Sequence, residues 1–183
     1  MLGLPDAAVG AIVAALITGL ISLLGLIISK EQKVSEFRQA WIDALRADIA
    51  AVLAHAQAIH GAYVTRFASS AETWKAVRDD FYGINEAGAR VKLRLNPKEA
   101  QATALLKLLE EHEGLISANP PDFAKLPRVE TNLLAASQAI LKSEWDRVRS
   151  GEPTYRIAQA AALGVTAACV LAIVWTIVVA SRP

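Results

Sequence analysis

Three histidines are the side chains of this sequence best suited to bind a metal ion or to transfer a proton near neutral pH. They are His55, His60 and His112. Two histidines bind one metal ion from a helix when they lie four residues apart, because that spacing places both on one face. His55 and His60 are five residues apart, and His112 is distant from both. The spacing therefore favours solvated or packed histidines over a metal site.

The sequence also lacks the short motifs that carry common enzymatic chemistry. It contains no HExxH, no glycine-rich phosphate loop, no Gly-x-Ser-x-Gly and no Cys-x-x-Cys. Its densest group of carboxylates, Glu110, Glu111 and Glu113, is typical of a solvated helix end. Its single cysteine, Cys169, cannot form an intrachain disulfide. We therefore predict no enzyme activity, with no catalytic residues, no cofactor and no metal.

Two long segments without any charged side chain, Ala7 to Ser29 and Ile157 to Ser181, dominate the sequence. Each exceeds the roughly 20 apolar residues that cross a bilayer as a helix. All charged side chains other than Asp6 and Arg182 lie between Lys30 and Arg156. The pattern predicts an all-α protein with a transmembrane helix at each end and a helical region between them. We place the three regions at residues 1–29, 30–156 and 157–183.

The basic residues near the two apolar segments predict the orientation in the membrane. Only Arg182 lies on the terminal side of either segment, whereas six basic residues lie on the side of the central region. These are Lys30, Lys33, Arg38, Arg147, Arg149 and Arg156. Because Lys and Arg concentrate on the cytoplasmic side, we predict a bacterial inner-membrane protein with a cytoplasmic central region and both termini outside. The first segment is longer than a signal-peptide core and follows no basic residue, so we expect it to be retained.

The first half of the central region has the apolar spacing of packed helices. The helix of the first segment is predicted to continue to about Phe67, because no Gly or Pro occurs from Leu26 to His60. Its apolar residues recur every three or four positions, at Val34, Phe37, Trp41, Leu45, Ile49, Val52, Ala56, Ile59 and Tyr63. A second helix follows Ser69, where the spacing to Glu72 predicts a capping box. Its apolar seam runs from Trp74 to Leu95.

Glycine and proline divide the second half of the central region. Asn96 and Pro97 predict the start of a third helix that ends at Glu113, with Gly114 as its C-cap. The segment from Ser117 to Pro127 contains three prolines and is expected to be irregular. A fourth helix is expected from Arg128, and a break at 151–153 precedes the second apolar segment. Four such helices, packed antiparallel, predict a bundle or coiled-coil stalk.

Small residues recur every four positions in both apolar segments. They are Ala11, Ala15, Gly19, Ala160, Gly164, Ala168 and Ala172. Small residues at this spacing form a smooth stripe on one helix face and let two helices approach closely. The stripes indicate helix packing within one chain or between chains. The alternative is that alanine-rich segments produce such stripes by chance.

The basic residues Arg90, Arg94 and Lys98 share one face of a helix, because each follows the previous one by four positions. One interpretation is a solvated face whose charges pair with nearby acids. The other is a contact with an anionic lipid or an acidic partner, which requires the turn near Asn96 to lie close to the membrane. No aromatic platform accompanies the charges, and the net charge is only +1, so we predict no nucleic-acid binding.

The segment Lys33–Arg46, directly after the first apolar segment, resembles one that recurs after the first span of uncharacterised bacterial two-pass membrane proteins. Leu93–Pro97 is similar to a companion motif in those proteins. Together the two segments cover about a tenth of the chain. The resemblance implies a bacterial source and names no activity.

The sequence leads to one functional prediction and one alternative. We predict an integral membrane protein that acts through homo-oligomerisation, or by binding a protein partner in the cytoplasm through its helical bundle. The alternative is an oligomeric ion channel or pore-forming effector, lined by Thr18, Ser22, Thr166 or Thr176. Neither apolar segment carries the charged residues that carriers and voltage sensors need, so a pore would require several copies of the chain.

Overall fold

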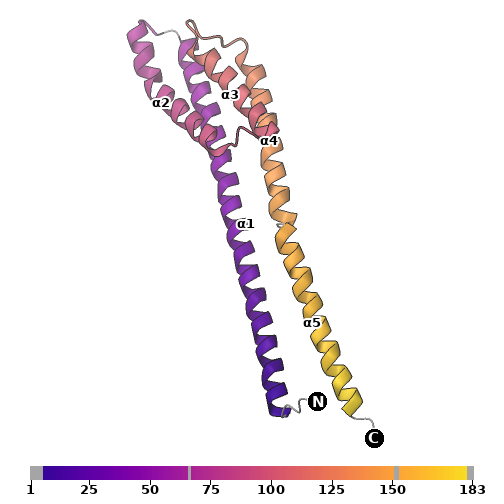
Figure 1. The fold of residues 1–183 in the computed structure, drawn as a ribbon. Coiled ribbons are helices and arrows are strands. Elements are labelled where there is room, and N and C mark those ends of the chain that lie inside the picture. The colour runs from indigo at the N-terminus through magenta and orange to yellow at the C-terminus, as the bar shows by residue number, and fades with distance from the viewer. Residues whose placement is uncertain (1–5, 66, 151–152, 181–183) are drawn as a thin grey trace. The chain divides into compact units, whose positions relative to one another are not determined.

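A computed structural model describes residues 6–65, 67–150 and 153–180. These residues form five helices and no strand, which confirms the predicted all-α class for the described part of the chain (Figure 1). The helices are α1 (Asp6–Thr65), α2 (Ser70–Arg94), α3 (Ala100–Ser117), α4 (Leu126–Ser150) and α5 (Pro153–Ala180).

The chain divides into two compact units. The apolar unit comprises Met1–Phe37 and Arg147–Pro183, and the core unit comprises Arg38–Asp146. Helix α1 contributes to both units, because it is a single helix of 60 residues. The predicted continuation of the first helix beyond Lys30 is therefore confirmed.

Helix α2 begins where the capping motif predicts. The Ser69 hydroxyl accepts a hydrogen bond from the backbone N–H of Glu72 at 3.2 Å. In return, the Glu72 carboxylate accepts one from the backbone N–H of Ala68 at 3.2 Å, one residue before the usual partner. The helix continues to Arg94, so residues 90–94 are helical although basic and apolar side chains alternate there.

Helix α3 differs from the prediction at both ends. Asn96 does not cap it: the Asn96 side-chain oxygen accepts from the backbone N–H of Lys98 at 3.1 Å and closes a turn, and the helix begins at Ala100. The predicted C-cap at Gly114 is also wrong, since the helix runs on to Ser117. The added turn buries Ile116 in the core, and this burial outweighs the roughly 1 kcal/mol cost of a glycine inside a helix.

Helix α4 begins at Leu126, two residues before the predicted start. Leu126 is buried in the core, and Pro127 fits a first helical turn because no helical hydrogen bond is needed from its nitrogen there. The irregular connection before α4 is confirmed for residues 118–125. Of the break predicted at 151–153, residues 151 and 152 lie outside the described residues, and α5 begins at Pro153.

The core of the core unit is formed by apolar side chains from all four of its helices. The largest buried ones are Leu45, Ile59, Leu105, Leu109, Leu126 and Leu133. Polar pairs fix the relative direction of the helices. On α1 and α2, Asp48 pairs with Arg94 while the later His55 pairs with the earlier Asp80, so these two helices run in opposite directions. The pairs Arg38–Glu144 and Gln57–Glu130 give the same antiparallel order for α1 and α4.

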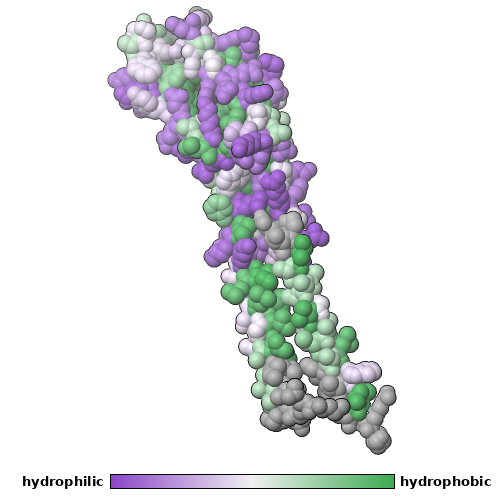
Figure 2. Space-filling model, in the orientation of Figure 1, coloured by the Kyte–Doolittle hydropathy of each residue, from purple (hydrophilic) through white to green (hydrophobic). Residues whose placement is uncertain are grey.

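The described part of the apolar unit exposes large apolar side chains along both of its helices (Figure 2). They include Leu16, Ile21 and Leu26 on α1, and Ile157, Leu171 and Trp175 on α5. The two most apolar helical windows, within Ala14–Thr65 and Leu126–Ala172, are long and apolar enough to cross a membrane. Their buried shares are only 0% and 6%. Almost no residue in either window is therefore fully buried within the described chain.

Candidate functional site

The predicted small-residue stripes lie on exposed helix faces. All seven residues of the two stripes, Ala11, Ala15, Gly19, Ala160, Gly164, Ala168 and Ala172, are exposed. A Cβ atom added at Gly19 or at Gly164 would meet no other atom within 4 Å. Close packing of the two stripes on each other within the described chain is therefore not observed, and both remain open to a neighbour.

Two of the hydroxyls proposed to line a pore bond within their own helices. The Thr18 hydroxyl donates to the Ala14 carbonyl at 2.9 Å, and the Thr166 hydroxyl donates to the Ala162 carbonyl at 2.9 Å. Each hydroxyl oxygen can still accept a hydrogen bond, but its proton is already donated to a backbone carbonyl. Ser22 is exposed, and the side chain of Thr176 lies outside those described.

The basic group on α2 meets a buried carboxylate. Asp48 of α1 is 5% exposed, and its two oxygens accept from Arg90 at 2.6 Å and from Arg94 at 2.7 Å. Arg90 also pairs with Glu86 on its own helix. The two guanidinium groups clamp one carboxylate, and this Asp48 clasp joins α1 to the end of α2. The anion that Arg90 and Arg94 bind in this structure is therefore the Asp48 carboxylate of the same chain.

The charge balance at the Asp48 clasp keeps the carboxylate ionised. Burial alone would raise the pKa of Asp48, but the hydrogen bonds and charges of Arg94 and Arg90 outweigh it and hold the pKa below its usual range. Asp48 was not among the predicted site residues, because a charged side chain does not fit an apolar seam. Its position contained the signal, since it lies three residues after Leu45 and four before Val52, both of which are buried.

The third predicted basic residue lies apart from the Asp48 clasp. Lys98 is exposed in the turn after α2, and its ammonium has no ion-pair partner among the described residues. The neighbouring Lys92 binds Glu113 of α3 at 2.6 Å. The sequence interpretation of a basic face paired with acids describes the observed contacts of Arg90, Arg94 and Lys92. Contact with an outside anion remains a proposal for Lys98.

Two of the three histidines pack against other helices or loops of the core unit. His55 Nδ1 lies 2.8 Å from Asp80 Oδ1 on α2, and the other edge of its ring lies against Gly83, where an added Cβ atom would collide with the imidazole. The His60 ring stacks on Phe123 with a centroid distance of 4.7 Å. No group of three metal-binding side chains occurs among the described residues.

The third histidine, His112, is fully buried between helices. Its Nε2 atom lies 3.6 Å from Glu130 Oε1 on α4, too far for a hydrogen bond. The other Glu130 oxygen accepts from the side-chain amide of Gln57 on α1 at 2.7 Å. His112 continues the seam of α3, because it follows Leu109 by three residues and Leu105 by seven. That spacing was the signal for its burial.

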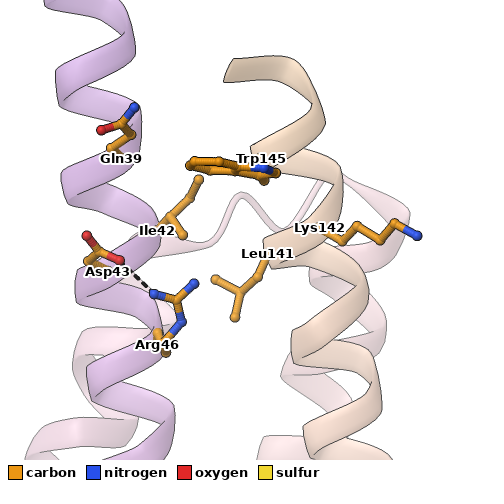
Figure 3. A pocket seen from close by; sticks show the side chains of 7 residues that line it. All are labelled: Gln39, Ile42, Asp43, Arg46, Leu141, Lys142 and Trp145. Carbon is orange, nitrogen blue, oxygen red and sulfur yellow. Dashed lines mark hydrogen bonds and ion pairs between the residues drawn. The ribbon is translucent and has the colours of Figure 1, made fainter. Parts of the chain in front are cut away.

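A groove of about 540 Å³ lies between α1 and α4 within the core unit. It is lined by Gln39, Ile42, Asp43, Arg46, Leu141, Lys142 and Trp145. Figure 3 shows Ile42, Leu141 and Trp145 around the space between the helices, while the Lys142 amine points away from it. Asp43 and Arg46 pair with each other at 2.7 Å. The groove offers apolar walls but no convergent charges that would select a ligand.

Comparison with protein-family models, with curated proteins and with solved structures finds no match to this chain. The described residues form five helices, with two long apolar helices, a packed core unit and the Asp48 clasp.

Proposed function

We propose that the chain is an integral membrane protein with two transmembrane helices, the first part of α1 and α5. The core unit then forms an antiparallel helical bundle in the cytoplasm and supplies an interface to further copies of the chain or to a protein partner. The exposed apolar surface of both helices carries this proposal. That surface finds a favourable environment in the hydrocarbon core of a bilayer.

The exposure of their apolar side chains supports a membrane-spanning role for these helices over a role as core helices of a water-soluble protein. The core helix of a water-soluble protein reaches similar length and hydropathy, but its side chains are covered by other elements. Here the large apolar side chains, such as Leu26 and Trp175, are exposed, and no charge interrupts either segment. Contiguous apolar surface of this extent would cause aggregation in water.

Association of several copies is the second part of the proposal. In a bilayer, helices associate through close packing rather than through the hydrophobic effect. The open stripes at Gly19 and Gly164 leave room for a neighbouring backbone. A second copy of the chain would supply that backbone.

The proposed topology predicts which sites a membrane-impermeant thiol reagent can reach. Cys169→Ser removes the native thiol, and single cysteines are then introduced by Lys107→Cys in α3 and by Ser181→Cys after α5. In intact bacterial cells with a permeable outer membrane, the second variant is expected to be labelled and the first only after lysis. Labelling of both in intact cells would disprove the orientation, and release of the protein by alkaline carbonate would disprove insertion.

The proposed association predicts a position-specific effect of bulk on α5. Gly164→Leu is expected to convert most of the oligomer to monomer, measured by native mass spectrometry in detergent. The reason is that the leucine side chain would separate the packed backbones. Val165→Leu adds bulk on an adjacent face and is expected to leave the oligomer intact. Equal oligomer fractions in the wild type and in both variants would contradict packing through the stripe.

A further inference from the structure

His112 and Glu130 form a polar pair that the surrounding core leaves unsatisfied. Among the described residues, the buried side-chain atoms without a hydrogen-bond partner are His112 Nδ1, His112 Nε2 and Glu130 Oε1. Burying a polar group without a partner costs free energy, so such groups are rare and need an explanation. This pair lies where three helices meet, because Glu130 also receives the Gln57 amide from α1.

The charged groups around His112 come from several helices. Glu130 faces it from α4 at 3.6 Å, and Glu113 adds a second negative charge from α3 itself. From α2, Lys92 reaches this region by pairing with Glu113. From α1, the amide of Gln57 donates to the other oxygen of Glu130, and this amide does not titrate. Two carboxylates therefore favour a protonated ring, and its complete burial opposes one.

We propose that His112 makes the core unit proton-sensitive: the neutral ring packs between the helices, and proton uptake opens the contacts of α3 with its neighbours. The physical reason is that an imidazolium in the core would lose its hydration, and its attraction to Glu130 at 3.6 Å only partly replaces that hydration. In an opened state, water solvates the charge. Protonation therefore favours opening.

The direction of the pH effect follows from proton linkage. Burial lowers the pKa of His112 below its usual value of 6.5, and attraction to Glu130 only partly offsets this. The opened state, with its ordinary pKa, then binds a proton more readily than the packed state. The stabilisation by neutral His112 is complete above about pH 6.5 and is lost as the pH falls below it.

Hydrogen exchange on the full chain in detergent tests the proposal. Amides of α3 and of the first half of α4 are compared at pH 7.5 and pH 5.5, after correction for the intrinsic exchange rate. The opening constant of the wild type is expected to rise by up to about tenfold at the lower pH. In His112→Leu the rise should disappear. A rise of equal size in this variant, or none in the wild type, would overturn the proposal.

Two control variants test whether the rise of the opening constant at low pH comes from His112. The double variant His55→Gln/His60→Gln removes the other histidines and should keep the rise. Glu130→Gln removes the nearest negative charge and should also keep it, because an imidazolium becomes still less favourable. Loss of the rise in either variant would contradict the assignment to His112.

A measurement on the wild type covers the case in which His112→Leu does not fold. The ring carbons of ¹³C-labelled histidine report protonation in the folded chain. His112 is expected to show no titration between pH 7.5 and 5.5 while the amides of α3 remain protected. Titration of a protected His112 near pH 6.5 would overturn the proposal.

Discussion

Replacement of Leu105 by alanine is expected to lower the free energy of unfolding of the core unit by about 3 kcal/mol. Leu105 is fully buried in α3 and belongs to the core shared by all four helices. The substitution removes buried methyl groups and leaves a cavity that the surrounding helices fill only in part. Urea unfolding of the full chain in detergent, followed by far-UV circular dichroism, measures the change.

The matched control for this core substitution is Leu93→Ala. Leu93 lies on α2 and is 87% exposed, so its truncation removes little buried area. We expect a change within about 0.5 kcal/mol, typical of surface positions. Similar losses for the two leucines would show that the observed core does not stabilise this unit.

Replacement of Asp48 by alanine is expected to cost about 2 to 3 kcal/mol. The loss leaves Arg90 and Arg94 partly buried without their shared carboxylate. Removal of one partner of a fully buried ion pair costs about 3 to 5 kcal/mol, and the value here is smaller because both arginines still reach water. The same urea titration at pH 7 provides the measurement.

A neighbouring aspartate and the pH dependence separate this effect from a general loss of charge. Asp43 is exposed on the same helix and, among the described residues, pairs with Arg46 alone, so Asp43→Ala should cost below about 0.5 kcal/mol. The pKa of Asp48 is lowered in the folded chain, so its contribution is complete above about pH 4 and decreases as the pH falls further. The wild type and Asp48→Ala should therefore converge in stability in acid. A constant difference down to pH 2 would contradict the role of the ionised carboxylate.

The helical seam of α1 shows how far apolar spacing predicts the core. Its regular part from Leu45 to Ile59 is buried throughout, because a period near 3.5 residues keeps one face toward neighbouring helices. Phe37 belongs to the same apolar stripe of the sequence, yet it is 75% exposed. Phe37 lies outside the core unit, and α2 and α3, which supply packing partners for α1, belong to the core unit. Periodicity predicts which face of a helix can be buried, but burial also requires another element that packs against that face at the same position along the helix.

The ends of α3 show the limit of local signals. Asn96, Pro97 and Gly114 are ordinary capping and breaking residues, and each was predicted to act as one at an end of α3. In the structure, the burial of Ile116 extends the helix past Gly114. Such a tertiary gain has no local signature, whereas the Ser69 cap of α2 depends only on residues next to it.

The polar contacts of the core unit were the least predictable part of the candidate site. Asp48 and His112 occupy buried positions of the helical seams, but neither is apolar, so apolar periodicity does not predict them. Arg90 and Arg94 were found by their spacing, which contains no information about their partner. A pairing between residues more than 40 positions apart depends on how the helices pack, and only the folded chain shows that.

The ion pair between Arg38 and Glu144 also bears on the order in which the core unit assembles. Its two residues are separated by 106 positions, whereas Lys92 and Glu113 are separated by 21. The entropy lost in joining two points rises with the length of chain between them, so short-range pairs form more readily. We expect the α2–α3 hairpin to form early, and α4 to dock on α1 last. During synthesis, the face of α1 that packs against α4 therefore stays uncovered until α4, the last helix of the core unit, emerges from the ribosome.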